Sequence, residues 1–278
     1  MSAIEFSLLI GAASLLAGFL GSLTGLGGGV VIVPVLALLF KVDIHYAIGA
    51  SLVSVIATSS GSSSAYVRKG FSNMRIGLLL EIATTTGAIL GAFLATGTPT
   101  GKIAVIFGFA LLLSAAISVR HKKKQAPDRP GDPLATRLRL NASYPVGETM
   151  EPYQVRRIPL GFGLMFGAGT LSGLLGIGSG AVKVLALDEA MMIPFKVSTS
   201  TSNFMIGVTA AASAGIYLSR GYVQPAIAMP VTLGVLAGSL LGAQFLVRAR
   251  TQAIRILFAV VIAALGIEMI YSGFTGRL

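Results

Sequence analysis

Long apolar stretches, separated by short polar segments, follow one another along most of the chain. Because a helix needs about 20 residues to cross the hydrocarbon core of a bilayer, these stretches predict membrane segments. In the first half they cover residues 4–22, 26–40, 46–67, 76–97 and 101–119, and in the second half residues 158–175, 178–193, 198–218, 224–246 and 252–273. The second segment of each half is short and follows a run of glycines, so we expect a half-helix or a re-entrant piece there.

One fixed offset relates the two halves. A shift of 151 residues places Gly25–Gly29 on Gly176–Gly180 and Ser51 on Ser202. The sequence therefore predicts a duplication. Two apolar halves that glycines interrupt at corresponding positions are typical of a secondary transporter whose binding site lies between the repeats.

The number of crossings decides how the halves are oriented. Five crossings per half, or three with a re-entrant pair, predict inverted repeats, whereas four predict parallel repeats. Basic residues collect in cytoplasmic loops. We favour inverted repeats because only then do Arg248 and Arg250 share a side with the basic linker, although Arg220, Asp188 and Glu189 argue against this.

The composition agrees with the predicted fold class, an all-α integral membrane protein of two homologous repeats with about four to five segments each. Apolar residues make up 54% of the chain, charged residues 11%, and the mean hydropathy is +0.84, whereas a soluble domain has roughly 25% charged residues. We expect an N-terminal repeat at 1–120, a basic, proline-containing cytoplasmic linker at 121–157 and a C-terminal repeat at 158–278. The protein is then a multi-pass protein of the cell membrane, with the lipid bilayer as a partner.

The positive charges are concentrated in the region between the halves, which supplies +5 of the net charge of +11. Nine of the 21 lysines and arginines lie in residues 120–157. Positive-inside topology explains a basic cluster between two apolar halves, so we expect no nucleic-acid partner. We also expect a small local fold around Leu138 to Val155.

Few residues offer catalytic chemistry. The chain has no cysteine, and its two histidines, His45 and His121, fall in a loop and in the linker. No carboxylate pair occupies two segment centres, and no P-loop pattern is present. We therefore expect no catalytic residue, no metal site and no cofactor, and an intramembrane enzyme is only the alternative from another class.

The glycine runs admit two interpretations. Small residues spaced every four positions allow helices to approach closely. Clustered glycines can also break a helix, and the new helix start holds an anion through free N–H groups and partial positive charge. We favour the anion-facing break, with Gly27, Gly28 and Gly29 in the first half and Gly178, Ser179 and Gly180 in the second.

Lys183 stands out because it lies within an apolar segment and corresponds to Ile32. A charge at this depth costs about 3 kcal/mol on insertion scales, so it is expected to face a cavity or a partner. The alternatives are that Lys183 extends to the membrane interface or pairs with Asp188 or Glu189.

Hydroxyl-rich helix starts provide a second set of candidate ligands. Ser51, Ser202 and Asn203 lie near the breaks and could donate to an oxyanion, although membrane serines more often bond to their own helix. Glu81 and Glu268 lie near segment ends, where we expect them to be interfacial or paired and not to carry protons.

The chain resembles the sulfite exporter TauE/SafE family of membrane permeases. The resemblance rests on Gly25–Gly29 with Pro34, on residues 47–52, on residues 171–180 and on residues 196–205. It implies transport of sulfite, or of related sulfur oxyanions and organosulfonates, usually export across the bacterial inner membrane.

We expect a small oxyanion to bind near the midplane between the two glycine breaks, where fixed donors replace its water. The open alternatives are an importer, a proton-coupled permease or a channel for another small anion. The coupling ion and the oligomeric state, including a homo-oligomer, also stay open.

Overall fold

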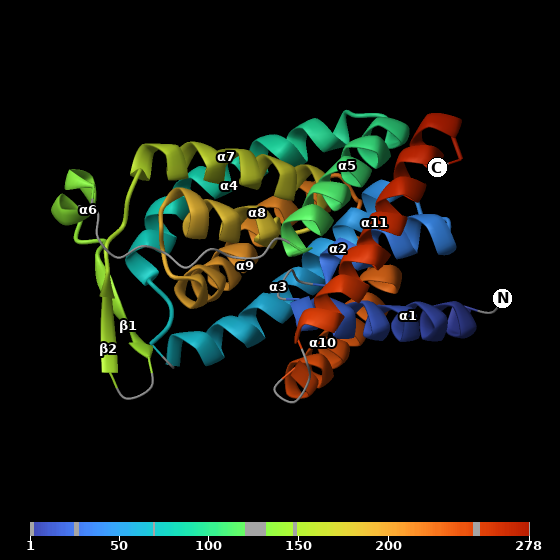
Figure 1. Cartoon of the computed structure of the whole chain (residues 1–278). Coiled ribbons are helices and arrows are strands. Elements are labelled where there is room, and N and C mark those ends of the chain that lie inside the picture. Colours follow the sequence, from blue (N-terminus) through green and yellow to red (C-terminus); the bar gives the residue numbers. More distant parts are fainter. Residues whose placement is uncertain are drawn as a thin grey trace.

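The computed structural model describes residues 3–24, 28–68, 70–119, 132–146, 149–246 and 251–277. It is mostly helical, with 79% of residues in helices and with eleven α-helices in these ranges (Figure 1). Eight of the helices are long: α1 (Ala3–Thr24), α3 (Ile44–Arg68), α4 (Met74–Thr96), α5 (Thr100–Val119), α7 (Ile158–Leu175), α9 (Phe195–Ser219), α10 (Pro225–Leu246) and α11 (Thr251–Thr275). Their ends lie within three residues of the predicted segments.

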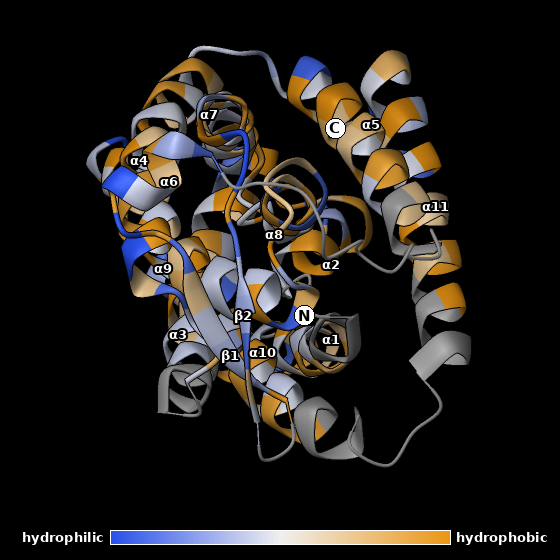
Figure 2. Ribbon diagram, turned by 60° about the vertical axis from the view of Figure 1, so that its left-hand side comes forward, coloured by the Kyte–Doolittle hydropathy of each residue, from blue (hydrophilic) through white to orange (hydrophobic). Residues whose placement is uncertain are grey.

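The second segment of each half is a short broken helix, as expected. In the first half, α2 (Gly29–Pro34) continues into a π-helical turn, η1 (Val35–Leu39); in the second half, α8 (Gly180–Leu185) continues into η2 (Ala186–Ala190). At 1.5 Å per residue each element is about 16 Å long, half the thickness of the hydrocarbon core. Figures 1 and 2 both place α2 and α8 in the middle of the molecule.

The long helices pack in pairs that join the two halves. α1 packs on α10, α4 on α7, α5 on α11 and α3 on α9. Glycines allow the backbones to touch, since a Cβ added to Gly173 would overlap the carbonyl oxygen of Ala88, and one added to Gly238 would overlap that of Leu15. These close contacts are the helix approach that small residues permit in membranes.

The direction of each pair follows from these contacts. Along α5 and α11, Gly101 lies against Gly273 and Gly108 against Gly266. Residue numbers therefore rise along one helix while they fall along the other, so α5 and α11 are antiparallel. In the α4–α7 pair the numbers rise together, with Thr84 against Gly169 and Ala88 against Gly173, so those helices are parallel.

Helix α4 shows the side-chain distribution of a membrane helix. It exposes Leu78, Ile82 and Phe93, while Glu81 and Thr84 are buried. Apolar residues outside and polar residues inside suit a helix whose outer face contacts lipid. In the described part of the chain, α4 and α7 are long and apolar enough to cross a membrane by length and composition alone.

The region between the halves contains the only β-strands in the described ranges. Helix α6 (Pro133–Arg137) is followed by β1 (Ala142–Val146) and β2 (Thr149–Tyr153), which pair antiparallel. The fold is therefore not strictly all-α, and the hairpin lies where the small local fold is expected. Figure 2 shows hydrophilic residues on α6 and on the strands. Residues 121–131 of the predicted linker lie outside the described residues.

The hairpin is fixed to the start of α4. The amide nitrogen of the Asn73 side chain donates to the carbonyl of Leu140 over 2.9 Å and to the Tyr153 hydroxyl over 2.8 Å. Burial raises the pKa of Tyr153, which keeps the phenol neutral in this contact. The same Asn73 caps α4, accepting from the N–H of Ile76.

Candidate functional site

The crossing of α3 and α9 lies next to the breaks that precede α2 and α8. The Ser51 hydroxyl, on α3, donates to the carbonyl oxygen of Gly176 over 2.8 Å. A Cβ added to Gly29 would lie 2.8 Å from the Ser51 oxygen and 3.1 Å from the Gly176 oxygen. Gly29 and Ser51 from the first half thus meet Gly176 from the second, and no side chain larger than hydrogen fits between them.

The second break has an unusual backbone. Gly176 and Gly178 have φ of +67° and +68°, and Ser179, the residue that precedes α8, has φ of 45°. A residue with a side chain rarely adopts this left-handed conformation, because its Cβ approaches the next carbonyl. Strain of this kind persists where the surrounding structure imposes it, often at functional sites.

Two serine hydroxyls of the second half are buried without a partner among the described residues. Ser179 is 3% exposed and Ser202, on α9, is 1% exposed, and neither Oγ atom has a hydrogen bond. A buried unpaired hydroxyl is costly and calls for an explanation, such as a bound ligand. Both serines are among the predicted ligands.

The other predicted ligands are placed differently. Gly27 lies outside the described residues. Gly28 precedes α2 in an ordinary right-handed conformation and packs on α10, where an added Cβ would lie 2.5 Å from Cγ1 of Val235. Gly180 begins α8, and Asn203 is a partly buried residue on α9.

Lys183 is completely buried, on α8 one turn past Ser179. Its Nζ donates to the Thr209 hydroxyl over 2.6 Å. The alternative that Lys183 extends to the interface is therefore wrong, because its side chain turns inward toward α9. Pairing with Asp188 or Glu189 is wrong as well, since the contacts of Lys183 lie with Thr209 and, electrostatically, with Glu81.

Glu81 completes this cluster from α4. It is 6% exposed, its Oε1 lies 2.7 Å from the Thr209 hydroxyl, and the Thr85 hydroxyl donates to the same oxygen over 3.0 Å. Glu81 is thus paired and not interfacial. We call Glu81, Thr209 and Lys183 the charged cluster.

The sequence also contains a feature that distinguishes Glu81, in addition to the one that distinguishes Lys183. The offset of 151 places Lys183 on Ile32 and Glu81 on Thr232. Both charges therefore occupy positions that are uncharged in the other half. Comparing the halves for charges of this kind marks Glu81 and Lys183, together with Asp188, Glu189 and Glu268, but does not pair them.

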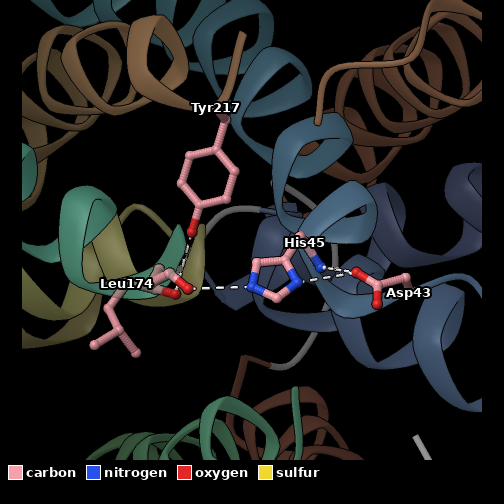
Figure 3. Close-up of polar contacts among 5 residues, drawn as sticks. Asp43, His45, Leu174 and Tyr217 are labelled. Carbon is pink, nitrogen blue, oxygen red and sulfur yellow. Dashed lines mark hydrogen bonds and ion pairs between the residues drawn. The ribbon is translucent and has the colours of Figure 1, made fainter. Parts of the chain in front are cut away.

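His45 belongs to the structural framework around the breaks. It lies in the first turn of α3, not in a loop, and its Nδ1 is 3.0 Å from Asp43 and its Nε2 3.1 Å from the carbonyl of Ala95. Figure 3 shows the Tyr217 hydroxyl pointing toward Leu174, to whose carbonyl it donates over 3.4 Å. The Tyr217 bond holds the end of α7 just before the second break.

A similar contact is present at the corresponding positions, since the offset of 151 places His45 on Lys196 and Phe71 on Tyr222. His45 stacks on Tyr222 with ring centroids 4.9 Å apart, and Lys196 lies over the ring of Phe71 at 5.9 Å. Within the described ranges, no group of three or more His, Asp or Glu is placed to hold a metal ion.

Half-length helices in the centre, a buried charged cluster and an apolar outer face define a multi-pass membrane protein of the transporter class. Comparison with known proteins identifies the group within this class. The chain belongs to the sulfite exporter TauE/SafE family, whose model matches residues 10–269.

Curated relatives agree with this assignment. The probable membrane transporter protein YunE of Bacillus subtilis is 30% identical over 267 residues, covering 93% of this chain and 95% of the relative. YdhB of the same species is 28% identical, covering 83% and 86%, and a probable membrane transporter protein of Methanocaldococcus jannaschii is 24% identical, covering 91% of each chain. These names indicate a membrane transporter and not an enzyme. No solved structure matches the chain.

Proposed function

We propose that the protein is a secondary transporter that exports a small sulfur oxyanion, sulfite or an organosulfonate, bound between two inverted repeats. The observation that carries the proposal is a fully buried lysine one turn from a strained helix break, in a chain of the TauE/SafE family. Such a lysine can compensate the charge of an anion that has lost its water.

The direction of the helices supports inverted repeats. The offset maps α5 onto α11, and these two helices are antiparallel. If corresponding helices cross the membrane in opposite directions, the symmetry axis lies in the membrane plane, which is the arrangement of inverted-repeat transporters. The basic linker between the repeats is then cytoplasmic by the positive-inside rule.

Polar atoms of the second half form the proposed binding site. Ser179 and Ser202 offer unpaired hydroxyl groups, and Lys183 offers a charge. Gly29 and Ser51 of the first half pack against Gly176, and the Ser51 hydroxyl donates to the Gly176 carbonyl, so it supports the second break instead of donating to the anion. An oxyanion with several acceptor oxygens needs such a set of fixed donors, because each hydration bond it loses must be replaced.

The test is anion flux in proteoliposomes that contain the purified protein. Sulfite, sulfate, thiosulfate and methanesulfonate are compared for the wild type and for Lys183→Ala. Saturable flux that the substitution abolishes supports the proposal. Flux of none of the four anions by folded protein contradicts the substrate class. A flux rate far above carrier turnover identifies a channel. Net flux in the direction of uptake instead of export identifies an importer.

A matched pair of substitutions tests the placement of the site. Ser179→Leu puts an apolar side chain at the second break and is expected to abolish flux. Gly167→Leu makes a comparable addition on the exposed face of α7, where an added Cβ meets nothing within 4 Å, and is expected to leave flux unchanged. Equal flux in the two variants would contradict this placement.

A further inference from the structure

We propose that the charged cluster is a proton-coupling relay, in which Glu81 takes up one proton when an anion binds beside Lys183. The inference rests on the proposed function, because it requires an anion at the lysine. It goes further by naming the residue that binds a proton together with the anion, so that one proton leaves with each exported anion.

The three side chains form a chain of contacts across three helices. Lys183 on α8 donates to Thr209 on α9 over 2.6 Å, and the Thr209 oxygen is 2.7 Å from Oε1 of Glu81 on α4. Because Lys183 and Glu81 lie in opposite halves of the chain, a change of charge at one end acts directly between the halves.

The hydrogen bonds of the cluster are compatible with both the ionised and the protonated form of Glu81. Oε1 of Glu81 has two hydrogen bonds, whereas Oε2 is buried and has none among the described residues, so Oε2 is the free position for a proton. The Thr209 hydroxyl has a single proton but two acceptors at 2.7 Å, Glu81 Oε1 and the carbonyl of Met205. It can donate to the carboxylate and then turn to Met205 once Glu81 is neutral.

Charge balance gives the stoichiometry. In the empty site, the Glu81 carboxylate and the Lys183 ammonium sum to zero. A monovalent anion beside Lys183 would leave a net negative charge in the membrane interior, which is costly. One proton on Glu81 restores neutrality, since the neutral acid, the ammonium and the anion again sum to zero. The anion and the proton therefore bind together.

On the helices that pack against α4, no charged group in the described ranges other than Lys183 acts on Glu81. α7, which packs on α4, has no titratable side chain between Ile158 and Leu175. α9, the other helix against α4, carries Lys196, which lies over Phe71, and Tyr217, which bonds to the end of α7. On α4 itself, Arg75 turns to the carbonyl of Arg139. Lys183 is the charge that acts on Glu81.

Calorimetry of sulfite binding to the purified protein tests the relay. Measurements in two buffers with different ionisation enthalpies give the number of protons taken up per bound anion. Sulfite itself can bind a proton, so the quantity of interest is the difference between the wild type and Glu81→Gln. We expect the wild type to take up one proton more than the variant.

The pH dependence of the affinity provides the second readout. In the wild type the affinity should rise about tenfold for each unit by which the pH falls, after the same correction for sulfite, because binding takes up one proton. Glu81→Gln, which resembles the protonated acid, should bind sulfite without this slope. Glu268→Gln makes the same change on the exposed part of α11 and should retain the wild-type slope.

The outcomes are distinguishable. Equal proton uptake by the wild type and Glu81→Gln overturns the relay while anion binding, and with it the proposed function, stands. Loss of binding in Glu81→Gln also overturns it, since a neutral side chain at this position should favour the anion. If the wild type binds none of sulfite, sulfate, thiosulfate and methanesulfonate, the proposed function fails and the relay fails with it.

Discussion

The two glycine breaks have corresponding helices but different chemistry. At the second break Lys183, Thr209 and Glu81 form a buried charged cluster. The corresponding positions at the first break are Ile32, Thr58 and Thr232. Ile32 is fully buried, and the Thr58 hydroxyl bonds only within its own helix, to the carbonyls of Ser54 and Val55.

The backbone differs as well at one position. Gly28 is right-handed, with φ of −66°, whereas Ser179, which corresponds to it, is left-handed. Glycine would fit the left-handed position better than serine, yet the glycine stands at the right-handed position and the serine at the left-handed one. The second break thus carries a strained serine where the first carries an unstrained glycine that packs on Val235 of α10.

The largest effect is expected when Lys183 near the second break is replaced by isoleucine, the residue at the corresponding position of the first half. Lys183→Ile leaves Glu81 as a buried charge without compensation, so we expect a loss of about 3–5 kcal/mol in the free energy of unfolding. Adding Glu81→Thr, the residue type at the corresponding position, should recover most of this loss. Denaturant unfolding in detergent micelles measures both variants.

Transport separates the two roles of the cluster. The double variant should be stable yet should not transport, because the lysine is absent. A double variant that is no more stable than Lys183→Ile would contradict the view that the two charges compensate each other.

The sequence predicts the helices well, and the reason is physical. Span length and apolar runs set the ends of the long segments, and the glycine runs mark the two half-helices. The π-helical turns and the hairpin pairing leave no comparable pattern. Lys183 is exceptional among its apolar neighbours, but its partners cannot be read from those neighbours. Glu81 reaches it only because α4 and α9 pack together.

The next contrast concerns the two corresponding threonines. Thr209→Val removes contacts with an ammonium and a carboxylate, so we expect a loss of about 3 kcal/mol, from two bonds of about 1.5 kcal/mol each. Thr58→Val removes a hydroxyl that bonds to its own helix and should cost less than about 1 kcal/mol. Thermal unfolding of the two variants in the same detergent compares them, and equal shifts would contradict a special role for Thr209.

Close packing between the halves gives a smaller effect. A Cβ at Gly173 would overlap the Ala88 carbonyl, so Gly173→Ala should destabilise the protein by about 1–3 kcal/mol through a forced shift of α7 from α4. Gly167→Ala, on the exposed side of the same helix, should not destabilise, since alanine is the better helix former. If both variants unfold at the same denaturant concentration, the α4–α7 contact is not as close as the structure shows.

The smallest effect comes from Ser179, where stability and binding should change in opposite directions. Ser179→Gly relieves a left-handed conformation that costs a side chain about 1–2 kcal/mol, partly offset by the about 0.5–1 kcal/mol that glycine loses in chain entropy, so the protein should become slightly more stable. The same change removes a hydroxyl from the proposed site, so sulfite should bind more weakly. Unfolding and calorimetric titration of this variant measure the two effects. If Ser179→Gly is more stable but binds sulfite more weakly, the strained serine serves ligand binding and not stability. Unchanged affinity would show that the Ser179 hydroxyl does not contact the anion.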